Sequence, residues 1–229
     1  MTFEEYYATD SSGNEIYKED RFGNQFYAFV KDSSKVHAKK ANGKKFYAQT
    51  KDKDEFYPTI RKTSIPIIES NGKTIYAKKA NGAQIYPKGK NKKEFVLVNE
   101  HSNFYYAKDE NDDEVYPTLR NGQQYMPKDG MYAKKSSGEP TYPRDERGLP
   151  VYPTDINGNE TYALKHPVTN RPIFGLDKEG NQRYAKDRFN DEYYPARETV
   201  AKDSFGNDTY ASTKDGRIVY PKRSNGNEY

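Results

Sequence analysis

The chain has 229 residues, of which only 33% are hydrophobic, and its mean hydropathy is −1.21. These values exclude a large conventional hydrophobic core and approach those of disordered proteins. The aromatic content of 14% and a strict sequence period favour ordered repeats instead. The 38 basic and 34 acidic residues are interspersed, which predicts solubility rather than a basic stripe for phosphate binding.

The sequence also limits the kinds of site and compartment. It contains no cysteine, which excludes disulfides and thiolate metal sites. No stretch reaches the apolar length of a membrane span, and the acidic start M-T-F-E-E-Y-Y differs from a signal peptide. We therefore expect synthesis in the cytosol, and incorporation into a virion or an extracellular assembly is left open.

A tyrosine returns at nearly fixed spacing of about ten residues, which is the signature of a repeat architecture. Seventeen of the 22 tyrosines lie on this register, and 13 of the 16 glycines lie at one turn position within it. The tyrosine row consists of Tyr7, Tyr17, Tyr27, Tyr47, Tyr57, Tyr76, Tyr86, Tyr106, Tyr116, Tyr132, Tyr142, Tyr152, Tyr162, Tyr184, Tyr194, Tyr210 and Tyr220. The turn glycines are Gly13, Gly23, Gly43, Gly72, Gly82, Gly122, Gly138, Gly148, Gly158, Gly180, Gly206, Gly216 and Gly226.

We call the segment from one tyrosine of the row to the next an interval. The first complete interval predicts a strand, a turn and a second strand. In D-S-S-G-N at residues 10–14, aspartate suits the start of a type I turn and Gly13 the left-handed position that follows. Asp112 and Asn190 replace glycine in two later intervals, and both residue types tolerate a left-handed backbone. Lys53, at the same position, is an exception to this pattern.

The turn fixes the register of the two strands, because pairing continues outward one residue at a time. Ala8 then faces Ile16, Tyr7 faces Tyr17, and tyrosines meet across strands. The same register predicts the pairs Thr9–Glu15, Ala48–Phe56, Ala77–Ile85, Ala107–Val115, Lys108–Glu114, Lys186–Glu192 and Ala211–Val219. A small residue opposite a large one predicts a thin apolar layer.

The residue after each tyrosine often alternates between alanine and proline, as in Ala48 and Pro58, which predicts a unit of about 20 residues. Proline suits a strand whose N–H makes no bond. We expect about nine two-stranded hairpin modules in one array over residues 1–229. Irregular excursions are expected near 59–75, 88–104 and 164–180, with Ile67 and Val96 near the places of missing tyrosines.

These patterns predict an all-β fold of tandem, tyrosine-centred hairpin repeats of 10 or 20 residues, in an extended meander or a solenoid-like array. Isolated hairpins are marginally stable, so neighbouring modules must share a sheet or stack. A rolled, barrel-like arrangement is the third alternative that the sequence leaves open.

Other candidate sites have simpler explanations. Asp109, Asn111 and Asp113 imitate the start of a calcium loop, but Glu114 replaces its glycine and Arg120 its final glutamate. The histidines His37, His101 and His166 are expected to be one ring in the tyrosine row and two loop residues. The sequons at Asn159 and Asn207 lie at turn positions. We expect no metal, no cofactor and no enzymatic activity.

The chain is therefore expected to be a structural protein, a subunit of a filament or of an assembled particle such as a virus coat. Its first residues already form a repeat strand, and its last residues, S-N-G-N-E-Y, end as the next strand begins. Such ends favour head-to-tail or edge-strand assembly with further copies, or association with other structural proteins. A glycan-binding or adhesive tyrosine face is the alternative, and interspersed glutamates weigh against nucleic acid.

Overall fold

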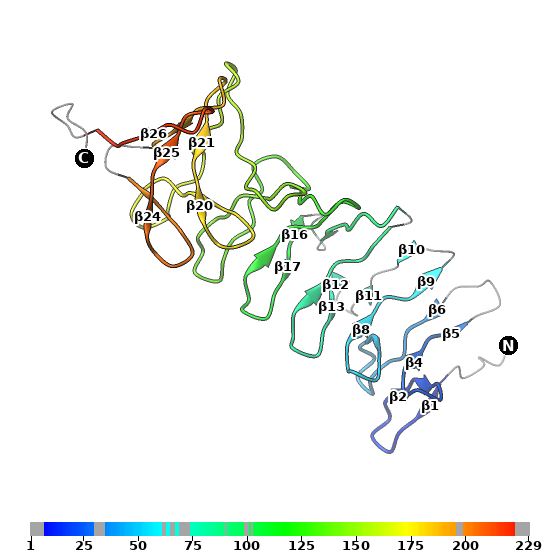
Figure 1. Ribbon diagram of the computed structural model, residues 1–229. Coiled ribbons are helices and arrows are strands. Elements are labelled where there is room, and N and C mark those ends of the chain that lie inside the picture. Colours follow the sequence, from blue (N-terminus) through cyan, green and yellow to red (C-terminus); the bar gives the residue numbers. More distant parts are fainter. Residues whose placement is uncertain are drawn as a thin grey trace. The chain divides into compact units, whose positions relative to one another are not determined.

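The computed structural model describes residues 7–29, 35–60, 63–64, 67–68, 74–89, 91–98, 101, 103–195 and 199–222. This part of the chain is all β and made of two-stranded antiparallel hairpins, as the sequence predicts, and these described hairpins form no closed sheet (Figure 1). Within these ranges no helix has the length and apolar character needed to cross a membrane. The chain divides into two compact units, Met1–Arg120 and Asn121–Tyr229. That these units form one continuous array stays a prediction.

The first unit contains nine hairpins in its described residues. Their strands are β1 (Ala8–Thr9) with β2 (Glu15–Ile16), β3 (Lys18–Glu19) with β4 (Gln25–Phe26), β5 (Ala28–Phe29) with β6 (Lys35–Val36), β7 (Ala48–Gln49) with β8 (Glu55–Phe56), β9 (Thr59–Ile60) with β10 (Thr63–Ser64), β11 (Ile67–Ile68) with β12 (Thr74–Ile75), β13 (Ala77–Lys78) with β14 (Gln84–Ile85), β15 (Leu97–Val98) with β16 (Phe104–Tyr105), and β17 (Ala107–Lys108) with β18 (Glu114–Val115). Isolated bridges Lys39–Lys45 and Lys88–Glu94 mark two further intervals with a shorter ladder.

The second unit repeats this construction with fewer extended ladders. Its described strands are β19 (Gly175–Leu176) with β20 (Gln182–Arg183), β21 (Ala185–Lys186) with β22 (Glu192–Tyr193), β23 (Ala201–Lys202) with β24 (Asp208–Thr209), and β25 (Ala211–Ser212) with β26 (Ile218–Val219). Single bridges Lys134–Pro140, Arg144–Pro150, Thr154–Glu160 and Lys165–Pro172 hold four more intervals. Hairpins are also present in the described parts of the three expected excursions.

The aspartate at the start of each turn explains why the chain reverses there. Asp10 Oδ1 accepts hydrogen bonds from Ser12 N and Asn14 N, and Asp10 Oδ2 accepts from Asn14 Nδ2. Gly13 N donates to Asp10 O at 3.0 Å, and Gly13 has a φ of 81°. Eleven of the thirteen turn glycines have φ between 79° and 92°, and Gly72 and Gly226 lie outside the described residues.

Non-glycine residues at the same position keep the same backbone. Asp112 and Asn190 have φ of 67° and 71°. Lys53, the exception to the sequence pattern, has a φ of 66° and its N–H donates to Thr50 O, so this turn closes like the others. The seven paired positions named from the sequence and the pair Ala8–Ile16 are Cα partners as predicted. Lys108, however, makes its ion pair with Asp112, at 2.9 Å, in addition to facing Glu114.

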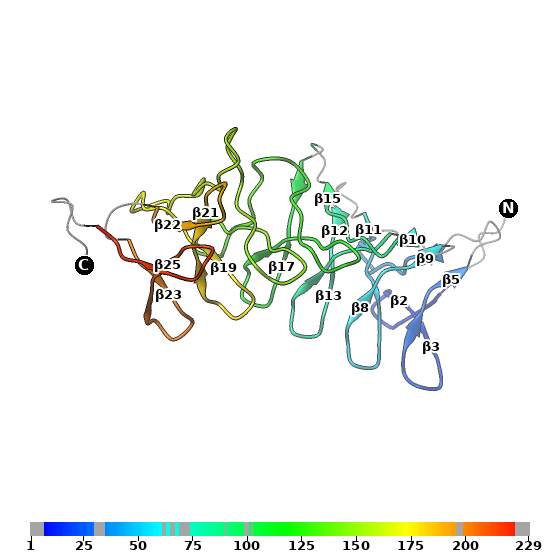
Figure 2. The same ribbon diagram turned by 45° about the horizontal axis from the view of Figure 1, so that its top comes forward.

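The spatial period is three intervals, whereas the alternation of alanine and proline implied two. Both kinds of interval fold into hairpins, and the described residues contain thirteen two-stranded sheets. The grouping into about nine modules stays a prediction. In the first unit, β4 contacts β7, β8 contacts β13, and β14 contacts β17. Figure 2 shows these hairpins in a row, with their turns on the same side. We call three successive intervals a coil, so each hairpin lies beside the hairpin one coil later.

The core of each unit is made of tyrosines and small residues instead of aliphatic side chains. In the first unit Tyr17, Tyr27 and Tyr47 are almost fully buried together with Ala38 and Ala48. In the second unit one cluster forms around Tyr142, Tyr152, Leu164, Ile173 and Ala185, and another around Phe174, Tyr184, Ala201 and Ala211. This explains how a chain with few aliphatic residues forms an ordered array.

Candidate functional site: tyrosine bridges between coils

The hydroxyl group of a tyrosine in one coil closes a hairpin of the next coil. Ala38 and Phe46 face each other at the open end of their hairpin, which we call the mouth. Phe46 N donates to Ala38 O at 3.2 Å, the ordinary ladder bond. Ala38 N instead donates to the Tyr17 hydroxyl at 3.0 Å, and that hydroxyl donates to Phe46 O at 2.6 Å. Tyr17 thus takes the place of the second bond of the pair.

Nine mouths in the described residues have a complete bridge of this kind, in which one hydroxyl both accepts and donates. They are Tyr17 at Ala38/Phe46, Tyr27 at Ala48/Phe56, Tyr57 at Ala77/Ile85, Tyr76 at Leu97/Tyr105, Tyr86 at Ala107/Val115, Tyr152 at Gly175/Arg183, Tyr162 at Ala185/Tyr193, Tyr184 at Ala201/Thr209, and Tyr194 at Ala211/Val219. The bridges join residues 17 to 31 positions apart. They therefore couple coils rather than strands of one hairpin.

The rings of the row also contact one another. Tyr7, Tyr17 and Tyr27 pack edge to face, with ring centroids 5.1 and 5.2 Å apart, an arrangement that stabilises aromatic pairs. Tyr17 further packs on Phe46, at the mouth that its hydroxyl bridges. Burial raises the pKa of Tyr142 to about 12 and also raises the pKa of the bridging Tyr17 and Tyr86, so these hydroxyls keep their proton.

The tyrosines of the row differ in burial along the chain. Twelve are buried; Tyr132, Tyr162 and Tyr194 are partly buried. Tyr210 and Tyr220 are 43% and 40% exposed, although their rings are only 5.2 Å apart. The row is therefore internal except at its last two members.

Proline stands at a mouth when the residue one coil earlier has no hydroxyl. Pro58 and Pro117 each follow by 21 residues a position of the row that is not tyrosine, namely His37 and Val96. A backbone N–H at these buried mouths would lack the acceptor that tyrosine supplies, and proline removes the donor. At Pro153 a tyrosine is present one coil earlier, because Tyr132 lies 21 residues before it. The mouth offers no N–H there, and the Tyr132 hydroxyl makes no hydrogen bond to a described residue.

The three histidines lie where the sequence places them in the repeat. His37 occupies a tyrosine position and packs edge to face between Tyr27 and Tyr47, at 5.4 and 5.8 Å. Its Nε2 is buried and has no hydrogen-bond partner among the described residues. Burial lowers the pKa of His37 to about 4, and the charge of Lys45 acts in the same direction. His166 accepts from two backbone N–H groups of its own turn, and His101 lies in a turn.

Two polar positions before each tyrosine, to which the sequence patterns assign no role, also join coils. Glu15, two residues before Tyr17, accepts a hydrogen bond from Lys39 N at 2.7 Å, and Asn14 accepts from Ala41 N at 3.0 Å. The same contacts recur from the side chains of Gln25, Glu55, Gln84, Glu94, Gln124, Glu160, Gln182 and Glu192. The preference for glutamate or glutamine, rather than any polar residue, is the signal that identifies this position.

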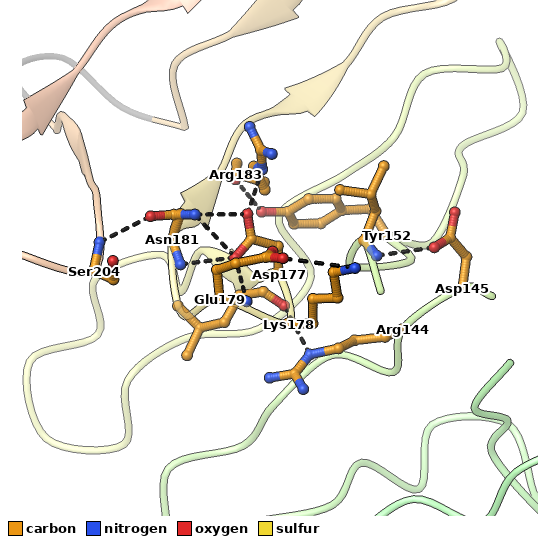
Figure 3. A network of polar contacts seen from close by, with 11 residues as sticks. Arg144, Asp145, Tyr152, Asp177, Lys178, Glu179, Asn181, Arg183 and Ser204 are labelled. Atoms are coloured by element: carbon orange, nitrogen blue, oxygen red, sulfur yellow. Dashed lines mark hydrogen bonds and ion pairs between the residues drawn. The ribbon is translucent and has the colours of Figure 1, made fainter. Parts of the chain in front are cut away.

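The most buried polar group of the second unit is Asp177, in one of these turns (Figure 3). Its carboxylate accepts from Asn181 Nδ2 and from Glu179 N, and Arg183 Nε donates to it at 2.9 Å. Burial alone raises the pKa of this carboxyl, but the hydrogen bonds and the Arg183 charge outweigh it and leave the pKa below its ordinary value. Figure 3 shows Asn181 also reaching Ser204, whose N–H it accepts at 2.9 Å.

The remaining sequence candidates are placed as follows. Asp109, at the start of the calcium-like stretch, accepts from Asn111 N and Asp113 N in an ordinary turn. Asn159 of the first sequon donates to Asp155 and accepts from Arg188 N. Within the described ranges, no three acidic or histidine side chains gather where they could hold a metal ion.

Comparison with known proteins does not add a family to this description. No protein-family model matches the chain, and no curated protein matches it.

Proposed function

We propose that the protein is a non-enzymatic structural repeat protein, a subunit of a filament or of an assembled particle such as a virus coat. The observation that carries this proposal is that the repeated polar residues bind backbone. Aspartate closes the turn, asparagine and glutamate or glutamine bind N–H groups one coil later, and tyrosine closes the mouth there. The features that recur most often are thus engaged in building the array. Further copies of the chain, or other structural proteins of the particle, are the proposed partners.

The glycan-binding alternative needs tyrosine faces that a sugar can reach. The buried rings are covered edge to face by their neighbours, and their hydroxyls are engaged with backbone groups. This supports a structural role for the row. Tyr210 and Tyr220 are the rings whose exposure favours the alternative.

Two measurements test the proposal. Electron microscopy and light scattering of the purified protein over a range of concentrations should show regular filaments or closed particles. A protein that stays monomeric at every concentration would contradict the proposal. A glycan array and salt-dependent nucleic-acid binding, run on the same sample, would identify the rival classes of partner.

Replacing Tyr106 and Tyr116 by alanine separates the structural role from the adhesive one. Both rings are 3% exposed and lie 5.2 Å apart, so we expect the free energy of unfolding to fall by ~2–5 kcal/mol. Thermal and urea unfolding would measure this. A variant that keeps its stability but loses binding on the glycan array would favour the adhesive protein.

A further inference from the structure

The last described coil carries bridging groups that close no mouth among the described residues. The hydroxyls of Tyr210 and Tyr220 make no hydrogen bond to any described residue. Asn207 donates to Asp203 at 2.8 Å, like Asn14 to Asp10, but its Oδ1 accepts from no N–H group of a described residue, whereas Asn14 accepts one from the next coil. In the other bridges the carbonyl partner follows its tyrosine by 25 residues or more.

The first described coil has the complementary mouths. Its two first hairpins end in the pairs Ala8/Ile16 and Lys18/Phe26, and no described tyrosine bridges either of them. Ile16 and Phe26 are 46% and 44% exposed. Ala8 is exposed, whereas Ala38, which occupies the same mouth position one coil later, is fully buried. Neither mouth carries a proline, so both keep the N–H that a hydroxyl would accept.

We propose that the Tyr210 end of one copy binds the Ala8 end of a second copy and forms across the junction the bridges that join coils within the chain. Tyr210 would close the Ala8/Ile16 mouth, and Tyr220 the Lys18/Phe26 mouth. Asn207 would accept from Ser11 N, as Asn14 accepts from Ala41 N. This inference rests on the proposed function and names the surfaces through which the copies assemble.

The fit is better at Tyr210 than at Tyr220. Asp208, two residues before Tyr210, is the acidic counterpart of Glu15 and faces Thr9 N in the proposed junction. Ile218 stands at that place before Tyr220 and has no such group. Lys18 occupies a mouth position that is alanine in most bridged hairpins, so its side chain must lie along the junction. We therefore expect Lys18→Ala to strengthen association.

Conservative substitutions test the hydroxyls. Sedimentation velocity of the Tyr210→Phe/Tyr220→Phe variant should show association weakened by about tenfold or more, because both bridges lose their donor and acceptor. Tyr132→Phe, which removes a hydroxyl that makes no described hydrogen bond, is the matched control and should associate like the wild type. Unchanged association of the double variant would overturn the inference. If these tyrosines bind a sugar instead, phenylalanine would retain binding on a glycan array and alanine would lose it.

The absence of cysteine allows a geometric test of the same junction. Within the chain, a Cβ built on Gly13 lies 3.5 Å from Ala41 Cβ, and one built on Gly180 lies 3.8 Å from Ser204 Cβ, within the range of about 3.5–4.5 Å that a disulfide needs. The corresponding junction pair is Gly206 with Ser11 of the second copy. Full chains carrying both Ser11→Cys and Gly206→Cys should form a ladder of disulfide-linked multimers on mild oxidation.

Gly180→Cys/Ser204→Cys is the matched control, because Gly180 and Gly206 share a φ of 88°. It should form a disulfide within one chain. Suppose that the control disulfide forms and the wild type assembles in light scattering, but the junction pair yields no multimers. The inference is then wrong, and the proposed structural function stands. If the wild type does not assemble at all, both are wrong.

Discussion

At the scale of the residue, one hydroxyl group does what a backbone bond would otherwise do. The Tyr86 hydroxyl accepts from Ala107 N at 2.9 Å and donates to Val115 O at 2.5 Å. Ala107 is buried, whereas Val115 is 36% exposed. An unpaired buried donor such as Ala107 N costs roughly 1–3 kcal/mol. The tyrosine ring alone cannot replace this contribution.

We predict that Tyr86→Phe lowers the free energy of unfolding by ~1–3 kcal/mol, because Ala107 N and Val115 O lose their partner. Tyr132→Phe should change it by less than ~0.5 kcal/mol. Adding Ala107→Pro to Tyr86→Phe should cost less than the sum of the single changes, since proline removes the orphaned N–H. Urea unfolding of the four variants measures this. Strict additivity would contradict the pairing of proline with missing hydroxyls.

His37 gives the array a dependence on pH. Its pKa is lowered in the folded protein from 6.5 to about 4, so the unfolded chain binds the proton more tightly. The stability from neutral His37 is fully present above about pH 6.5 and is lost as the pH falls towards 4. We predict that the urea midpoint falls over this window in the wild type and falls less in His37→Phe, which keeps a ring between Tyr27 and Tyr47. Parallel curves for the two proteins would contradict the prediction.

At the scale of the element, each hairpin is a short ladder whose mouth must accept a close neighbour. The mouth residue is alanine in most hairpins because the preceding coil covers it, as at Ala48, Ala77 and Ala185, which are fully buried. Gly175 takes this place in β19, where a Cβ would lie 2.3 Å from Pro150 Cβ. Even alanine is too large there.

We therefore predict that Gly175→Ala is strongly destabilising, by about 1–3 kcal/mol or more, because the added methyl group overpacks the contact with Pro150. Gly89→Ala is the matched control. Gly89 has no left-handed backbone, and the nearest atom to its Cβ would be Asn91 Oδ1 at 3.5 Å. Thermal unfolding of both variants gives the comparison. Equal melting temperatures would show that the coil can shift away from Pro150.

At the scale of the whole molecule, the unit that matters is the coil of three intervals. Each bridge crosses from one coil to the next, so a change in the number of intervals moves the tyrosines just before the change away from the mouths that follow it. Stability in such an array depends on the interfaces between neighbouring repeats. Bridges from one coil to the next are present within each of the two units.

Two internal deletions test the three-interval period. Removing residues 77–106 takes out one coil and lets Tyr57 meet Ala107/Val115 in place of Ala77/Ile85. Removing residues 77–96 takes out two intervals from the same junction and brings the Tyr76 hydroxyl opposite Pro117. We expect cooperative urea unfolding of the first variant and its loss in the second. The reverse result would favour the 20-residue unit.

The sequence alone determined the hairpins. The aspartate and glycine of each turn act within five residues, and the turn then fixes the register of the strands, so Ala8 opposite Ile16 follows from local chemistry. The expected assembly of the termini was predicted from residues 3–10 and 224–229, of which only residues 7–10 are described, and it stays a prediction. Tertiary structure decided how hairpins join. The coil of three intervals was hidden because one place in three often lacks tyrosine, as at Val96. The bridge from Tyr17 to Ala38 and Phe46 depends on a return of the chain in space that no local preference encodes.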